Sequence, residues 1–190
     1  MPEKMAADEI KVERISESHR NLLAGFKSHE KELVDFLLQD ALSNQDTHIS
    51  TTHLWIEKQS NKLIGYITLL ADALKLESAL KAEFRQKGIH YKSLPALKIG
   101  RLCVDDGFRQ RGVGTMMVDF TYCVAAETTE KFGCRFLTVD AKKNPDPGKS
   151  SLHFYRKLDF KTLKEREKGT TPLYKDVSKI IDGIRSRARP

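Results

Sequence analysis

Six consecutive residues in the middle of the chain combine the two features that bind phosphate groups in proteins. They are, in order, Arg109, Gln110, Arg111, Gly112, Val113 and Gly114. Glycine lets a backbone approach an anion closely, and guanidinium groups donate paired hydrogen bonds to phosphate oxygens. A helix that begins here would point its unpaired amides at the same ligand. The segment therefore predicts a pyrophosphate site.

The spacing excludes two common phosphate-binding motifs. The dinucleotide fingerprint requires a third glycine three residues after Gly114, where Met117 stands. The P-loop requires Gly-Lys-Ser or Gly-Lys-Thr, and no such tripeptide follows this turn. An ordinary glycine-containing turn with solvated arginines is the structural alternative.

Strand, turn and helix must position these residues. The pattern predicts a strand over Leu97–Val104, a turn over Asp105–Gly114 and a helix from about Val113 to Phe132, ended by Gly133. The helix carries an apolar stripe made of Val113, Met116, Met117, Phe120, Cys123 and Val124. Asp105 and Asp106 are expected to cap or solvate the turn.

The pattern from Arg109 to Gly114, after a strand that ends in Cys103-Val104, resembles the acyl-CoA pyrophosphate loop of the GNAT superfamily of N-acetyltransferases. The resemblance covers about residues 54–177. It implies an α/β (α+β) fold with a mixed, mostly antiparallel central sheet and helices on both faces, and acetyl-CoA as co-substrate. The implied cofactor-binding residues are Leu102, Cys103, Val104, Arg109, Gln110, Arg111, Gly112, Val113, Gly114 and Thr115.

The apolar alternation of the central strand breaks at Gly100-Arg101, because Leu97 and Ile99 share a face while Leu102 and Val104 have the opposite parity. A glycine at such a break suggests a β-bulge. In GNAT proteins a bulge in this strand opens the slot for pantetheine and the acyl group.

A second segment, residues 150–160 (SSLHFYRKLDF), carries the rest of the resemblance. GNAT proteins commonly end a helix here with an aromatic-Tyr pair followed by a Phe, which correspond to Phe154-Tyr155 and Phe160. The resemblance makes Tyr155 the general acid that protonates the departing thiolate, a role that a phenol within hydrogen-bond reach of the sulfur can fill. The structural alternative is that Tyr155 only packs against Phe154.

Two family features are missing from the sequence. Many GNAT enzymes place an acidic residue in the central strand, where this chain has Lys98, Gly100 and Arg101, so no general base is evident. The Asn that many members carry seven residues before the tyrosine corresponds to Gly148, with Asn144 farther off. A water chain or an acceptor amine of low pKa could replace a side-chain base.

Length and composition are those of one globular domain, residues 1–190, with a short basic tail from about 178. No apolar run reaches membrane-spanning length, and the N-terminus has no signal-peptide core, so a cytoplasmic protein is expected. Cys103, Cys123 and Cys134 suggest small buried side chains and not a disulfide framework, and no metal-ligand spacing appears.

The remaining chain alternates strand and helix patterns. Expected strands cover 10–15, 53–58, 62–70, 134–141, 160–163 and 172–177, and expected helices cover 21–26, 28–42, 72–87 and 150–158. Gln59–Asn61 should join two strands as a hairpin, and residues 43–46 should form a loop. Gly65 inside the second of these strands should relieve crowding where another segment passes close.

These features predict an N-acetyltransferase that transfers an acetyl group to a primary amine by direct attack in a ternary complex. The first alternative is an enzyme of the aminoacyl-tRNA-acetylating toxin branch, whose layout around Phe26, Phe36-Leu37 and Ile64–Leu69 is similar, although Lys27-Ser28 replace its usual Cys-Gly pair. Residues 1–129 carry 17 Lys/Arg and 18 Asp/Glu, whereas 130–190 carry 16 and 8, and such a basic region would suit tRNA. The second alternative is a non-catalytic CoA- or nucleic-acid-binding module. The resemblance also makes a homodimer possible.

Overall fold

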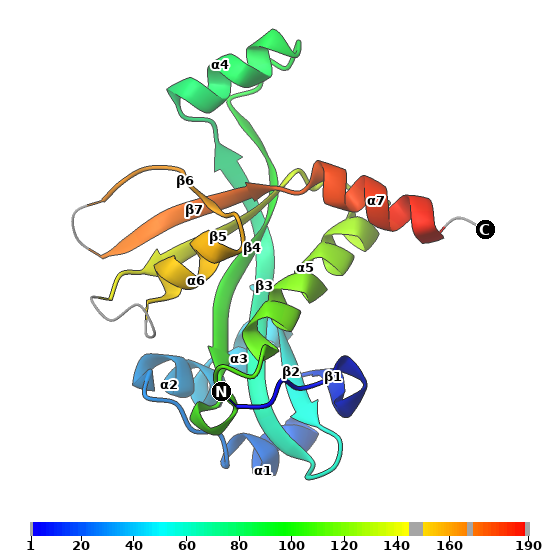
Figure 1. Cartoon of the computed structure of the whole chain (residues 1–190), viewed down its shortest axis with the longest axis vertical. Helices are drawn as coiled ribbons and strands as arrows, with labels where there is room; N and C mark the ends of the chain where they lie inside the picture. Colours follow the sequence, from blue (N-terminus) through cyan, green and yellow to red (C-terminus); the bar gives the residue numbers. More distant parts are fainter. Residues whose placement is uncertain (1, 145–149, 167–168, 189–190) are drawn as a thin grey trace. The chain divides into compact units, whose positions relative to one another are not determined.

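The computed structural model describes residues 2–144, 150–166 and 169–188 (Figure 1). Its α-helices are α1 (Arg20–Leu23), α2 (Lys31–Gln39), α3 (Ala41–Asp46), α4 (Ser78–Gln86), α5 (Val113–Thr129), α6 (Ser151–Lys157) and α7 (Ser178–Ala188). Its strands are β1 (Ile10–Arg14), β2 (Thr51–Glu57), β3 (Lys62–Lys75), β4 (Ser93–Val104), β5 (Phe136–Lys142), β6 (Lys161–Thr162) and β7 (Thr170–Asp176). Among the described residues, none of the helices combines the length and apolarity that crossing a membrane would require.

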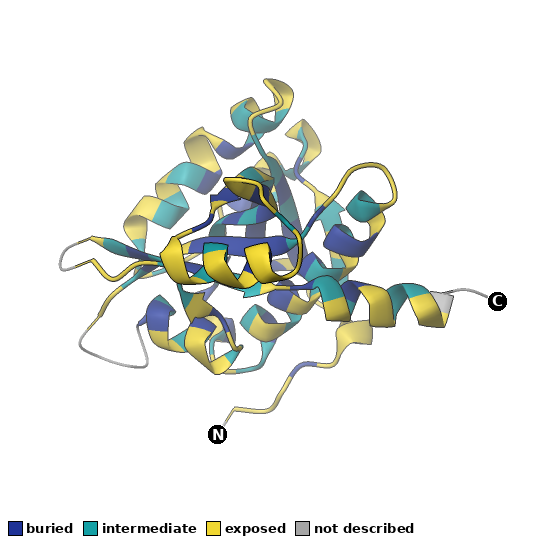
Figure 2. Cartoon of the chain, turned by 90° about the horizontal axis from the view of Figure 1, so that it is seen from above, coloured by how far each residue is buried: buried dark blue, intermediate teal, exposed yellow. Residues whose placement is uncertain are grey.

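The strands form a seven-stranded sheet in the order β1-β2-β3-β4-β5-β7-β6. The pairs β1–β2, β2–β3, β5–β7 and β6–β7 are antiparallel. This mixed α/β architecture with a mostly antiparallel sheet confirms the predicted fold class. Figure 2 shows the buried residues concentrated along the strands, while the outer sides of the helices are exposed.

The chain divides into two compact units. The first contains the residues up to Leu70 together with Ile99–Thr121, and therefore β1, β2, the start of β3 and the end of β4. Its core joins side chains of α1, α2, α3, β2, β3 and β4 and of the segments that follow β1 and α1. They are Ile15, Leu23, Phe26, Leu37, Ala41, Leu54, Ile56, Leu63, Tyr66 and Cys103. The predicted strand, turn and helix start fall in this unit. The prediction of one domain is not tested by this division and stays a prediction.

The second unit contains Ala71–Lys98 and the chain from Tyr122 onward. Its core joins α4 to strands β3, β4 and β5 through Leu74, Leu76, Phe84, Leu94, Ala96 and Phe136. The ring of Phe136 packs edge-on against Phe84 and Tyr174, with centroid distances of 5.8 and 5.7 Å. This unit holds the segment with Tyr155.

The predicted hairpin between β2 and β3 is confirmed, and it contains an irregularity that the sequence did not predict. Trp55 pairs with Gly65 and Ile56 with Leu63, so the register shifts and Ile64 is the extra residue. The carbonyl of Ile64 accepts a hydrogen bond from the Asp105 amide at 2.9 Å. The bulge therefore helps to hold the start of the predicted phosphate turn. The bulge predicted at Gly100-Arg101 stays a prediction.

The helix predicted over 72–87 is wrong in its first part. Strand β3 continues to Lys75, and α4 begins only at Ser78. Leu74 and Leu76 are buried while Lys75 between them is exposed, which is the two-residue alternation of a strand. The same leucines also fit a helical stripe with Leu80 and Phe84, and this ambiguity caused the error.

The helix predicted over 28–42 and the loop predicted over 43–46 are both corrected. Residues 28–30 precede the helix, α2 ends at Gln39, and α3 continues the chain to Asp46. The Gln45 side chain explains why this polar segment is ordered as helix. Its amide nitrogen donates to the Ile15 carbonyl at 2.7 Å and its amide oxygen accepts from the Thr52 amide at 3.4 Å.

The buried face of α5 differs from the predicted stripe. Val113 and Met117 are buried as expected, but the face continues through Val118, Thr121, Ala125 and Ala126. Cys123 is exposed, which corrects its predicted burial, whereas Cys103 and Cys134 are buried. The helix ends at Thr129, and Phe132 is exposed. Small side chains such as Ala125 and Ala126 lie on the buried face, so the largest apolar residues of the sequence do not identify it.

Candidate active site

The predicted phosphate turn lies between β4 and α5 in the first unit, and its backbone is unusual. Gln110 and Gly112 have left-handed conformations, with φ of 61° and 84°. A Cβ at Gly112 would meet no atom within 4 Å, so glycine serves the backbone conformation here and not a lack of space. Left-handed residues within a turn aim successive amides into one concavity, which is an anion-binding geometry.

Asp105 organises the start of the turn. Its side chain is 3% exposed, and one carboxylate oxygen accepts from the Gly107 amide at 3.0 Å while the other accepts from the Lys27 amide at 3.0 Å. The ammonium group of Lys62 lies 3.5 Å from the first oxygen. Asp105 therefore caps the turn, as expected, and also fastens it to the loop between α1 and α2. The Asp106 amide adds a hydrogen bond to the Lys27 carbonyl at 2.9 Å.

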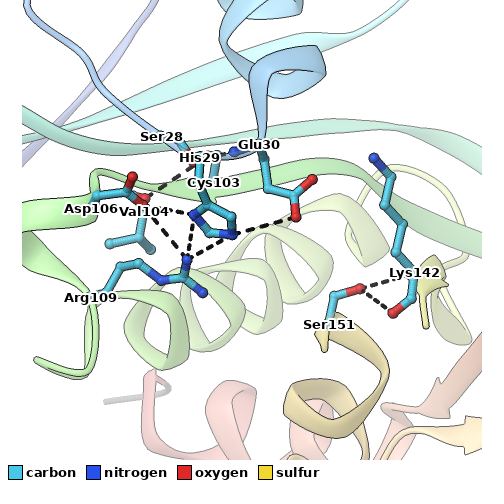
Figure 3. A network of polar contacts seen from close by, with 9 residues as sticks. All are labelled: Ser28, His29, Glu30, Cys103, Val104, Asp106, Arg109, Lys142 and Ser151. Carbon is cyan, nitrogen blue, oxygen red and sulfur yellow. Dashed lines mark hydrogen bonds and ion pairs between the residues drawn. The ribbon is translucent and has the colours of Figure 1, made fainter. Parts of the chain in front are cut away.

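The Arg109 guanidinium is held beside the turn by a histidine that sequence reasoning missed. Its Nη1 lies 2.7 and 3.0 Å from the two ring nitrogens of His29 and 3.6 Å from an Asp106 oxygen (Figure 3). His29 Nδ1 lies 2.9 Å from the same Asp106 oxygen, and Nε2 lies 3.5 Å from Glu30. His29 and Arg109 are 80 residues apart, so no local pattern could have paired them.

Arg111 is held on another side of the turn by the N-terminal segment. Its Nε donates to the Glu3 carbonyl at 3.1 Å, and its own carbonyl accepts from the Met5 amide at 3.1 Å. The guanidinium carbon lies 5.2 Å from the centroid of the Phe108 ring, within the range of a cation–π contact. Both predicted phosphate-binding arginines are thus fixed next to the turn by contacts within the first unit.

Helix α5 starts directly after these arginines. The Met116 amide donates to the Gly112 carbonyl at 3.1 Å, so the helical hydrogen bonds begin at Gly112. Val113 and Met117 are 1% and 0% exposed and anchor the first turn, while Gly114 is half-buried and Thr115 exposed. The first amides of a helix have no partner within the helix and carry the positive end of its dipole. The helix start can therefore bind an anion.

The residues predicted to hold pantetheine and the acyl carbonyl, Leu102–Val104, form the end of β4. Gly65 of β3 passes close to them, since a Cβ at Gly65 would lie 2.8 Å from the Cys103 carbonyl oxygen and 2.3 Å from the Met117 side chain. This confirms that Gly65 relieves crowding. Burial raises the pKa of the Cys103 thiol to about 11, against a smaller opposing effect of its hydrogen bond with Ser28. The thiol is therefore protonated at neutral pH.

Tyr155, the predicted general acid, lies on α6 in the second unit. The residue is 4% exposed, and its ring packs edge-on against Phe154 and Phe160 at centroid distances of 5.0 and 5.3 Å. Burial raises the pKa of the Tyr155 phenol, so it carries its proton throughout the neutral range. This is the protonation state that a general acid needs.

Two serines fix the beginning of α6. The Ser150 side chain accepts a hydrogen bond from the His153 amide at 3.4 Å. The Ser151 hydroxyl accepts from the Lys142 amide at 2.7 Å and donates to the Lys142 carbonyl at 3.1 Å (Figure 3). These contacts join the end of β5 to the helix that carries Tyr155. Gly148, the position of the usual GNAT Asn, lies outside the described residues.

Comparison with known proteins agrees with this geometry. The family model described as an acetyltransferase (GNAT) domain matches residues 50–162, which is more than half of the chain. The chain belongs to the GNAT acetyltransferases. The match covers strand β4, the phosphate turn and Tyr155, and it confirms the predicted family and reaction class. A search of curated proteins found no match.

Solved structures of GNAT proteins share the fold over almost the whole chain. A point mutant of KacT is 24% identical with a TM-score of 0.77, and the match covers 93% of this chain and 99% of the other. AtaT complexed with acetyl-methionyl-tRNAfMet is 22% identical with a TM-score of 0.74, covering 92% and 99%. AtaTR bound with acetyl-CoA is 23% identical with a TM-score of 0.73, covering 94% and 99%. At these identities the likeness establishes the fold.

Proposed function

We propose that this GNAT acetyltransferase transfers the acetyl group of acetyl-CoA to a primary amine by direct attack in a ternary complex. The observation that carries the proposal is the turn after β4, in which two left-handed residues, two fixed arginines and the start of α5 converge. A diphosphate fits this donor set, because backbone amides and guanidinium groups are the donors that phosphate oxygens prefer. Acetyl-CoA supplies the activated acetyl group as a thioester.

The roles of the remaining residues follow from the chemistry of acyl transfer. Arg109–Thr115 bind the pyrophosphate, and the amides of Leu102–Val104 bind pantetheine and donate to the acyl oxygen as it gains negative charge. Tyr155 gives its proton to the thiolate that leaves. No side-chain base is assigned, so the acceptor loses its proton to water or reacts as an amine of low pKa.

Binding and turnover test this proposal separately. Acetyl-CoA should raise the melting temperature, as any ligand selective for the native state must, and Arg109→Gln should reduce that rise. Arg85→Gln, which removes an exposed arginine of α4, is the matched control and should leave the rise unchanged. Release of free CoA thiol with a panel of amines then measures transfer. Binding without any transfer would favour the non-catalytic alternative.

A second candidate acceptor is aminoacyl-tRNA. AtaT, which shares the fold, has been solved with acetyl-methionyl-tRNAfMet, and the basic region 130–190 of this chain would suit a polyanion. Acetylation of charged tRNA in preference to free amines, with a rate that falls steeply as salt rises, would support it. Growth arrest on expression in bacteria, relieved by Tyr155→Phe, would support a toxin role.

The cellular setting is part of the proposal. We infer that the protein works in the cytoplasm, where acetyl-CoA and charged tRNA are available, and that its exposed and buried cysteines are free thiols there. Fractionation of cells that express the protein tests the location. Light scattering of the purified protein tests whether it forms a homodimer.

A further inference from the structure

Arg101 is a cation of the central strand β4 that has a buried and unused hydrogen-bond donor. Its Nη1 donates to the Gly100 carbonyl at 2.8 Å, while its Nε is buried and has no hydrogen-bond partner. No carboxylate in the described part of the chain forms an ion pair with it. A guanidinium group has five donors, and a buried donor without a partner costs free energy. The contacts within the protein thus leave Arg101 incompletely satisfied.

The position of Arg101 in strand β4 places its guanidinium group beside the hydrophobic core. Cys103, two residues after it, is 4% exposed and belongs to the core of the first unit, and alternate residues of a strand face the same side. Arg101 therefore lies next to a core position. An arginine there needs a compensating interaction, and a ligand can provide one.

An aromatic ring lies against the guanidinium of Arg101. The central carbon of the group lies 5.1 Å from the ring centroid of Phe36 on α2, and Phe36 stacks on Tyr66 at 6.3 Å. This cation–π contact holds the guanidinium without using its N–H donors. The donors can therefore bind an oxygen-bearing group.

Arg101 is also close to the proposed reaction centre along the chain. Each residue of a strand advances it by about 3.3 Å, so Arg101 is about 7 Å from the backbone of Cys103, the middle of the segment assigned to the acyl carbonyl. An acceptor whose nitrogen reaches the acyl carbon holds its neighbouring atoms within a few ångströms of that point. A carbonyl one carbon away from the nitrogen can then reach Arg101.

We propose that Arg101 determines acceptor specificity by binding the carbonyl or carboxylate oxygen next to the attacking nitrogen. The enzyme would therefore prefer an α-aminoacyl group, whether in an amino-acid amide, a peptide N-terminus or an aminoacyl ester, over a plain alkylamine. This inference rests on the proposed acetyl transfer to a primary amine.

The test compares two acceptors that share the amine and the side chain. Leucinamide carries a carboxamide next to its amine, and 3-methylbutylamine lacks it. We expect kcat/KM of the wild type to be at least about tenfold higher for leucinamide, because a site built to bind an oxygen rejects an analogue without it. Part of this preference comes from the lower pKa of an α-amino group, which leaves more of the amine unprotonated at neutral pH. Arg101→Met should reduce the preference at least about tenfold without lowering kcat/KM for the alkylamine, and Arg101→Lys should reduce it less.

Controls separate a specific role from a structural one. Arg101→Met should keep the wild-type rise in melting temperature with acetyl-CoA, and Lys98→Met, which removes another cation of β4, should keep the wild-type preference. An equal loss of kcat/KM for both acceptors, or an unchanged preference in Arg101→Met, would overturn the role of Arg101. A wild type that binds acetyl-CoA but acetylates no amine would overturn the proposed function and this role together.

Discussion

In the first unit, the turn Asp105–Gly114 is held by hydrogen bonds and charges, whereas in the second unit Tyr155 is held by aromatic packing. The turn depends on backbone conformations at Gln110 and Gly112 and on the buried carboxylate of Asp105. Tyr155 depends on its neighbours Phe154 and Phe160, which exclude water and raise the pKa of its phenol. Binding an anion requires oriented donors, while keeping a proton on an acid requires an apolar environment, so each unit has the interactions that its proposed role requires.

If the second unit uses packing to hold one functional hydroxyl, Tyr155→Phe should separate activity from stability. We expect kcat to fall about 100-fold or more, the usual contribution of a general acid. The melting temperature and the acetyl-CoA-induced shift should change little, because the ring stays. Release of CoA thiol measures the rate, and Tyr174→Phe, which alters another tyrosine of this unit, should stay within about twofold of wild type. An unchanged rate in Tyr155→Phe would remove this residue from its role.

If the first unit depends on close backbone approach, Gly65→Ala should be strongly destabilising. The added methyl group would lie 2.8 Å from the Cys103 carbonyl oxygen, and backbone cannot move aside as a side chain can. We expect a loss of about 1–3 kcal/mol in the free energy of unfolding, measured by denaturant titration. Gly25→Ala is the control, because its new Cβ would meet only the Leu22 carbonyl oxygen at 3.7 Å. Equal stability of the two variants would contradict the argument.

Two glycines with similar backbone conformations allow the proposed cofactor role of the turn to be tested separately from its effect on stability. Gly112 in the turn and Gly88 after α4 have φ of 84° and 76°, and neither has an atom within 4 Å of its Cβ position. Alanine at either site should cost about 1 kcal/mol of stability because of the left-handed conformation. Only Gly112→Ala should also raise KM for acetyl-CoA, by several-fold. A similar KM change in Gly88→Ala would show that the effect is not local to the turn.

The smallest expected effect concerns the thiols. Burial raises the pKa of Cys103 to about 11 and also raises that of Cys134, whereas Cys123 is exposed. At pH 8, iodoacetamide should therefore modify Cys123 first, as peptide mass spectrometry would reveal. Since the folded pKa of Cys103 lies above its ordinary value of 9.0, its contribution to stability is complete below pH 9 and is lost as pH rises toward 11. Rapid modification of Cys103 in the native protein at pH 8 would contradict the burial and the raised pKa of its thiol.

Sequence patterns correctly predicted the helices, strands and turns that are defined by residues close to one another in the sequence. The strand before the turn, the start of α5 at Val113, the hairpin at Gln59–Asn61 and the helix with Tyr155 all follow from residue order and turn chemistry. The errors at 72–75 and 43–46 arose where two periodicities fit the same leucines, or where a side chain such as Gln45 finds partners far along the chain.

By itself, the sequence determined the family of this protein and located the predicted phosphate turn and the candidate general acid Tyr155, because glycines, arginines and the aromatic pair act through their immediate neighbours. Only the tertiary structure decided that His29 and Asp106 hold Arg109, that Asp105 fastens the turn to the α1–α2 loop, and that Arg101 lies against Phe36 with a buried donor unpaired. Apart from the local pair Asp106–Arg109, these contacts join residues that are about 65 to 80 positions apart, or depend on what surrounds one atom. Folding alone brings such residues within hydrogen-bond distance.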